Sequence, residues 1–182
     1  MSNTLSLREY YHVEIIGGRE KKFSWLKVFR RARRGKRCNF MFWYRMAYVL
    51  YRKNNKTCKS LSNTIAMRLL KKYSVDITLA AQVGEGLSII HNVGIVVAGT
   101  AIIGKNCTLR QNTTIGTDFK SNEPIVIGDN VTIGANSCII GSGLKIGDNV
   151  TIGAMSFINK DIPSDSTYIT VKESKIIERN QP

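Results

Sequence analysis

Histidine is scarce in this 182-residue chain, which has only His12 and His91. The four cysteines form no CxxC pair, so we expect reduced thiols rather than disulfides or a zinc site. No run reaches the roughly 18 apolar residues of a membrane-spanning helix, and residues 1–11 lack the apolar segment of a secretory signal. P-loop and Rossmann fingerprints are missing, which argues against nucleotide hydrolysis and hydride transfer. These absences predict a cytoplasmic protein.

Acidic residues are rare in the first part of the chain. Residues 1–73 hold 19 Lys and Arg against 3 Asp and Glu, whereas residues 74–182 hold 8 against 10. In the stretch 19–37 the cations alternate with apolar and aromatic residues, a pattern typical of segments that contact anionic membrane surfaces. No nucleic-acid-binding motif accompanies the charge, so we expect no nucleic-acid partner. Peripheral contact with the inner face of the cytoplasmic membrane is one interpretation, and a solvated basic face is the other.

The second part of the chain is a repeat. An aliphatic residue followed by Gly recurs from Val83 to Ile152, mostly at spacings of 6 or 12. This period matches neither a helix nor simple strand alternation, and it predicts a parallel β-helix built from hexapeptides. The position after the aliphatic residue must be small because the wall bends there. Turn residues that tolerate positive φ follow three places after the aliphatic residue: Asn106, Asn130, Asn136 and Asn149.

The count of six is interrupted, and the chain divides at about residue 74. Ile95 and Ile103 are eight residues apart, and the polar stretch 117–126 replaces one hexapeptide, which predicts a loop on the wall. Helical spacing predicts helices over 40–53 and 58–73, packed on the first coil as a cap. We therefore expect a basic helical region over 1–73, a left-handed parallel β-helix over 74–163 with loop 117–126, and a tail over 164–182.

His91 is the only histidine of the repeat region, and an imidazole can take a proton from a hydroxyl. Asp76 stands fifteen residues earlier, so in a coil of about eighteen residues per turn the two would lie on neighbouring rungs. A carboxylate there would orient the imidazole and stabilise its charged form. On spacing alone, an ordinary structural role for the lone histidine is the alternative.

Residues 75–116 resemble the serine acetyltransferase branch of the hexapeptide acyltransferases, through the sequence VDITLAAQVGEGLSIIHNVGIVVAGTAIIGKNCTLRQNTTIG. The resemblance covers about residues 60–162. It implies a left-handed β-helix, a homotrimer with active sites between subunits, and acetyl-CoA as donor with no metal. It places the catalytic histidine on His91 and its partner on Asp76. It also implies that pantetheine lies against Gly116, Ala135 and Ala154. We further expect Lys172 and Lys175 to contact the CoA phosphates.

Two departures from that branch bear on the acceptor. Ile90 stands where serine acetyltransferases have an Asp before the histidine, and loop 117–126 lacks their Arg-His pair. An amino acid needs charged partners for its carboxylate and ammonium, and only Lys120 and Glu123 remain in the loop for this purpose, with Asn92 beside the histidine. We therefore expect an acceptor other than serine. The run from Arg110 to Gly116 is similar to relatives that acetylate sugars of capsules, exopolysaccharides or lipopolysaccharides. That resemblance implies, as acceptor, a sugar hydroxyl of a bacterial surface polysaccharide or its precursor.

Three other functions are alternatives to this one. Serine O-acetyltransferase itself is the first alternative. A non-catalytic, membrane-docked scaffold is the second, and it comes from a different class. A carbonic anhydrase on the same coil would need three zinc-binding histidines, which one coil histidine cannot supply.

We expect direct transfer of the acetyl group, without an acyl-enzyme intermediate. Cys107 and Cys138 lack a second histidine that could activate them as nucleophiles.

Overall fold

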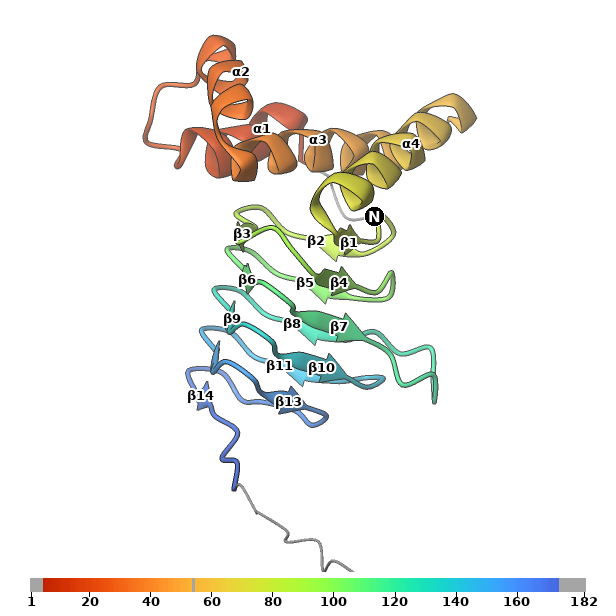
Figure 1. Ribbon diagram of the computed structural model, residues 1–182, viewed down its shortest axis with the longest axis vertical. Helices are drawn as coiled ribbons and strands as arrows, with labels where there is room; N and C mark the ends of the chain where they lie inside the picture. The colour runs from red at the N-terminus through yellow and green to blue at the C-terminus, as the bar shows by residue number, and fades with distance from the viewer. Residues whose placement is uncertain (1–4, 54, 174–182) are drawn as a thin grey trace, which may run out of the picture.

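The computed structural model describes residues 5–53 and 55–173. Helices occupy the first part of the chain and lie across one end of a β-coil that the second part forms (Figure 1). The helical elements are α1 Leu7–Tyr11, the π-helix η1 His12–Ile16, α2 Trp25–Arg34, α3 Lys36–Tyr51 and α4 Lys56–Tyr73. The helices expected over 40–53 and 58–73 are thus confirmed as parts of α3 and α4. The two elements that precede α2 were not predicted.

Local sequence signals set where the helices begin. Ser6 forms a capping box with Glu9, whose carboxylate accepts the Ser6 N–H at 2.7 Å. The side chain of Asn55 accepts the Thr57 and Cys58 N–H groups and starts α4. Gly35 separates α2 from α3, so the chain turns sharply there. That corner carries four cations, which matter below: Arg33, Arg34, Lys36 and Arg37.

The strands build a left-handed parallel β-helix with three walls, and this confirms the predicted fold. The first wall contains β1 Val75–Ile77, β4 Ile95–Val97, β7 Thr114–Gly116, β10 Cys138–Ile140 and β13 Phe157–Ile158. The second contains β2 Gln82–Val83, β5 Ile102–Ile103, β8 Val126–Ile127 and β11 Lys145–Ile146. The third contains β3 Ser88–Ile90, β6 Thr108–Arg110, β9 Thr132–Ile133, β12 Thr151–Ile152 and β14 Thr167–Tyr168.

One aliphatic side chain per hexapeptide enters the coil, and these side chains stack in register. Ile89 pairs with Leu109, which pairs with Ile133, and all three are fully buried. The predicted positive-φ asparagines are confirmed, with φ between 55° and 58°. Their amides also bond from turn to turn, since Asn106 donates to Asn130 at 3.0 Å. Burial of the aliphatic column and these ladders hold the turns together.

Three insertions disturb the regular coil. Ile115 and Ile127 are twelve residues apart, and the loop between them leaves the end of β7, as predicted (Figure 1). A single extra residue follows β10, because Ile139 and Ile146, the inward residues of β10 and β11, are seven residues apart.

The third insertion lies elsewhere than expected. Val97 and Ile103, the inward residues of β4 and β5, keep the regular spacing of six. By contrast, Ile89 and Val97 are eight residues apart. Their strand partners on the next turn, Leu109 and Ile115, are six residues apart. The extra pair of residues therefore lies at the corner that contains His91.

Arginines of α3 join the helices to the first turn of the coil. The Arg45 guanidinium is fully buried, pairs with Glu14 at 2.6 Å and donates to the carbonyl oxygens of Val83 and Gly84. Arg52 donates to the Leu79 and Ala81 carbonyl oxygens at 2.9 and 2.7 Å. These carbonyls lie at the open end of the coil, where no further strand can bond them. The expected cap is confirmed, and side-chain hydrogen bonds hold it in place.

Arg45→Met should destabilise the protein by about 3–5 kcal/mol, because Glu14 would remain as a buried, unpaired charge. Urea unfolding followed by circular dichroism measures the change. The double variant Glu14→Leu/Arg45→Met should recover much of the loss. Arg19→Met is the matched control, since Arg19 pairs with Glu85 but is half exposed, and its loss should cost about 0–1 kcal/mol. Equal losses for Arg45→Met and Arg19→Met would contradict the cap.

Candidate active site

His91 lies at the corner between the third and first walls, directly after β3. Its backbone is left-handed at φ 58°, a conformation that is unusual for histidine. The Val93 N–H donates to the His91 carbonyl at 2.7 Å, so the inserted residues form a tight turn. The imidazole is exposed at this corner. The insertion therefore presents the only histidine of the coil to solvent on a rigid support.

The same corner repeats on each turn, and we call this line of corners the His91 edge. Below His91 it holds Gln111–Asn112, Ala135–Asn136 and Ala154–Met155. The Met155 N–H donates to the Ala135 carbonyl at 2.8 Å, which places Ala154 directly below Ala135. Two of the three residues expected against pantetheine thus lie in one column under His91. Gly116 does not: it ends β7, at the opposite side of the first wall.

Asp76 lies on β1, the strand of the first wall that pairs with β4. Its side chain is exposed, and it sits opposite Val96, a few residues beyond the His91 corner. Among the described residues no hydrogen bond joins Asp76 to His91. The structure thus brings the two residues to the same end of the coil without a hydrogen bond between them, and the orienting role of Asp76 stays a prediction.

The remaining predicted site residues are dispersed. Lys120 and Glu123 lie on the loop after β7, and Lys120 pairs with Asp118 at 3.4 Å. This loop leaves the far end of the first wall, so within one chain it does not reach the His91 edge (Figure 1). Lys172 is exposed beyond β14, and Lys175 lies outside the described residues. Of the expected substrate residues, only Asn92 stands beside His91.

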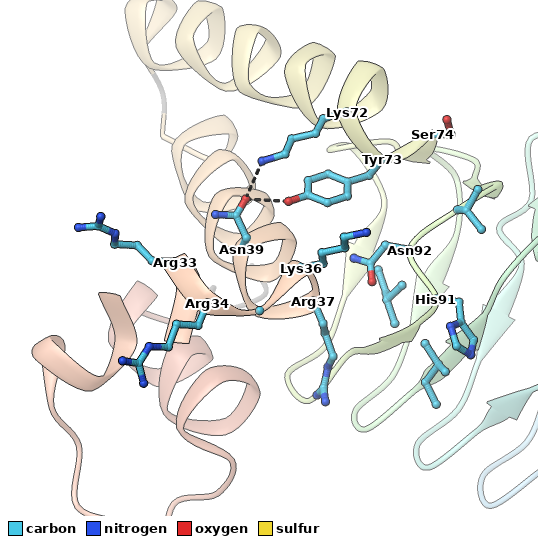
Figure 2. A pocket seen from close by; sticks show the side chains of 14 residues that line it. Arg33, Arg34, Lys36, Arg37, Asn39, Lys72, Tyr73, Ser74, His91 and Asn92 are labelled. Carbon is cyan, nitrogen blue, oxygen red and sulfur yellow. Dashed lines mark hydrogen bonds between the residues drawn. The ribbon is translucent and has the colours of Figure 1, made fainter. Parts of the chain in front are cut away.

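A cleft of about 1000 Å³ opens between the His91 corner and the helical cap. Its cations come from the α2–α3 corner and from the end of α4, and its other wall is the turn that carries His91 (Figure 2). The cationic side chains are Arg33, Arg34, Lys36, Arg37 and Lys72. Sequence reasoning missed these as site residues. The dense cations of 19–37 were the available signal, but we assigned them to a membrane surface.

Asn92 and Asn39 define two sides of this cleft. The Asn92 amide nitrogen is buried and has no hydrogen-bond partner among the described residues. Asn39 accepts the Tyr73 hydroxyl at 2.8 Å and donates to the Ala32 carbonyl at 2.9 Å. Asn39 thereby ties α2, α3 and α4 together, and the cations of the corner are held at a fixed place over the coil.

The two cysteines of the coil are poor nucleophiles. Burial raises the pKa of Cys107 to about 12 and also raises the pKa of Cys138. A thiol becomes a good nucleophile only as the thiolate, so at neutral pH these groups stay protonated. The site is therefore suited to direct transfer with a histidine base rather than to an acyl-enzyme on cysteine.

The stretch predicted to contact membranes contains α2, which buries Val28 and Ala32. Its outer side exposes Trp25, Leu26 and Phe29, with Leu26 78% exposed. Over residues 5–53 and 55–173, no helix combines the length and apolar character needed to cross a bilayer. Contact with an anionic membrane stays a prediction.

Comparison with known proteins finds the hexapeptide repeat and similarity to serine acetyltransferases. Residues 124–160 match the family model "Hexapeptide repeat of succinyl-transferase". The chain is similar to the hexapeptide-repeat acyltransferases over these residues. It is 37% identical over 128 residues to serine acetyltransferase 1, chloroplastic, of Arabidopsis thaliana, covering 69% of this chain and 40% of that protein. This chain thus spans less than half of that relative.

Solved structures agree with this relationship. Serine acetyltransferase isoform 3 of Entamoeba histolytica, in complex with cysteine, superposes with a TM-score of 0.74 at 28% identity, covering 96% of this chain and 62% of that one. The serine acetyltransferase of Neisseria gonorrhoeae, in complex with serine, gives a TM-score of 0.73 at 28% identity, covering 91% and 67%.

The prediction of a polysaccharide acceptor is wrong, because these relatives are serine acetyltransferases and one of them holds serine. The error has a structural cause. We expected charged partners for an amino acid to come only from loop 117–126, whereas the fold brings cations of the helical region beside His91.

The two cysteines of the coil allow a direct test of the transfer mechanism. After incubation with acetyl-CoA and acid quenching, intact mass and peptide mapping should find no acetyl group on Cys107 or Cys138, because both thiols are protonated at neutral pH. An acetyl group on either cysteine that is discharged when acceptor is added would contradict direct transfer.

Proposed function

We propose that the protein is an acetyl-CoA-dependent O-acetyltransferase that acts on the hydroxyl group of serine or a closely similar small acceptor. The placement of His91 carries the proposal. It is the only histidine of the coil, it is raised on an inserted turn, and the small residues Ala135 and Ala154 lie further down the same edge, beyond Gln111. The similarity to serine acetyltransferases supports both the donor and the acceptor.

In the proposed reaction the His91 imidazole removes the proton from the acceptor hydroxyl. The resulting alkoxide oxygen attacks the thioester carbon of acetyl-CoA, and a new C–O bond forms. The tetrahedral intermediate collapses with cleavage of the C–S bond, and the departing CoA sulfur takes the proton from the imidazolium. Asp76 supports the imidazolium from the adjacent strand as a positioning residue.

The donor would lie along the His91 edge. Pantetheine fits closely only where side chains are small, and Ala135 and Ala154 supply such a surface below the imidazole. The buried Asn92 amide nitrogen, which lacks a partner among the described residues, is our candidate hydrogen-bond donor to acceptor or oxyanion.

The predicted homotrimer is part of the proposal. Loop 117–126 and Gly116 lie at the far end of the first wall, away from His91. A neighbouring coil placed against the His91 edge would bring its own loop, with Lys120 and Glu123, to the site. Each active site would then contain residues of two subunits.

His91→Ala should lower CoA release with acetyl-CoA and L-serine by roughly 10²–10⁴-fold, because the general base is lost. A thiol-reactive dye follows the released CoA. His12→Ala is the matched control: its ring bonds the Lys21 carbonyl in the helical region, and its removal should leave turnover within about twofold.

Two results would overturn the proposal. Turnover that survives in His91→Ala would show that another group is the base. Absence of CoA release by the wild-type protein with L-serine and its close analogues would favour the non-catalytic scaffold instead.

A further inference from the structure

The cleft between His91 and the helical cap is strongly cationic. Five Lys and Arg side chains line it, and no Asp or Glu appears among its lining residues. Among the described residues none of these five forms an ion pair, although other cations of the chain do. Like charges gathered without a counterion repel each other, and a bound anion relieves that repulsion.

Two of the cations are best placed to face a ligand beside the imidazole. Lys36 and Arg37 begin α3 and project to the side of the cleft on which Asn92 and His91 lie (Figure 2). No side chain caps the start of α3, so its first N–H groups add to the positive potential there. The guanidinium fork of an arginine fits the two oxygens of a carboxylate.

The geometry of the His91 edge argues against the CoA phosphates as the occupant of this cleft. The column of Ala135 and Ala154 descends from His91 along the coil, away from the helical cap. A donor laid on that column with its thioester at His91 carries its phosphates toward the far end of the coil. The cationic cleft lies on the other side of His91, which is the side left for the acceptor.

We propose that this cleft binds the carboxylate group of the acceptor. Lys36 and Arg37 bind that carboxylate while His91 takes the proton of the acceptor hydroxyl. This inference rests on the proposed function. It assigns acceptor binding to the α2–α3 corner rather than to loop 117–126, and it makes the carboxylate the feature that the site selects.

The test compares Lys36→Ala/Arg37→Ala with Lys27→Ala/Arg30→Ala. The second variant removes the same charge from exposed positions of α2 that do not line the cleft. Saturation kinetics should show KM for L-serine raised roughly tenfold or more for each cation lost in the first variant. KM for acetyl-CoA should stay within twofold, and the second variant should resemble wild type for both substrates.

The carboxylate itself is tested with L-serinamide, which keeps the hydroxyl and lacks the anion. Wild type should prefer L-serine by at least tenfold in kcat/KM, and Lys36→Ala/Arg37→Ala should lose most of that preference. A larger effect on KM for acetyl-CoA than for serine would overturn the inference and assign the cations to the donor. Unchanged KM for both substrates would also overturn it.

A measurement without turnover separates this inference from the proposed function. At constant ionic strength, pyrophosphate should raise the unfolding temperature of wild type and of Lys27→Ala/Arg30→Ala, and should not raise that of Lys36→Ala/Arg37→Ala. If pyrophosphate stabilises the protein as expected but L-serine is not acetylated, the result would support an anion-binding site at Lys36 and Arg37 and contradict the proposed function. Serine turnover without a difference between the variants in either assay would contradict that site alone.

Discussion

The buried pair of Arg45 and Glu14 is the contact on which the arrangement of the site depends. A β-helix ends in carbonyl and N–H groups that no further turn can bond. Arg45 bonds two such carbonyls, and Glu14 accepts the N–H groups of Gly86 and Leu87 at 3.0 and 3.1 Å. The ring of Tyr10 lies 4.0 Å from the Arg45 guanidinium and shields it from water. The helical region is thus bonded to the first turn as a fixed part of the same structure.

Because the helical cap is fixed on the coil, the cations at the start of α3 are also held in a fixed position. α3 runs from the Gly35 corner to Arg52, so the element that docks on the coil through Arg45 begins with Lys36 and Arg37. On the coil side, the two inserted residues raise His91 from the corner toward the same space. A base and a group of cations therefore face one cleft, although about fifty residues separate them in the chain.

The coil could be predicted from sequence because its determinants are local. An aliphatic residue every six positions and an Asn three places later describe the regular rungs without reference to distant contacts, and both patterns hold there. His91 could be singled out because the coil holds no other histidine. The insertion was placed wrongly at Ile95–Ile103 because both Ile95 and Val97 point inward, and counting from Ile95 shifts the register.

The cap and the cleft could not be predicted in the same way. Arg45 and Glu14 are 31 residues apart and pair only once α3 lies on the coil. Helical periodicity identifies α3 but not the atoms that Arg45 bonds. The cations of 33–37 were visible as charge, yet their position over His91 depends on the turn at Gly35 and on Asn39. Because the position of these cations over His91 was not predicted, the acceptor was predicted wrongly.

A crystal structure of the protein with CoA bound tests the central claim most directly. We expect the pantetheine chain on the His91 edge, against Ala135 and Ala154, with its sulfur beside the His91 imidazole and the cationic cleft left open above it. CoA on another edge of the coil, or with its phosphates bound by Lys36 and Arg37, would contradict the account.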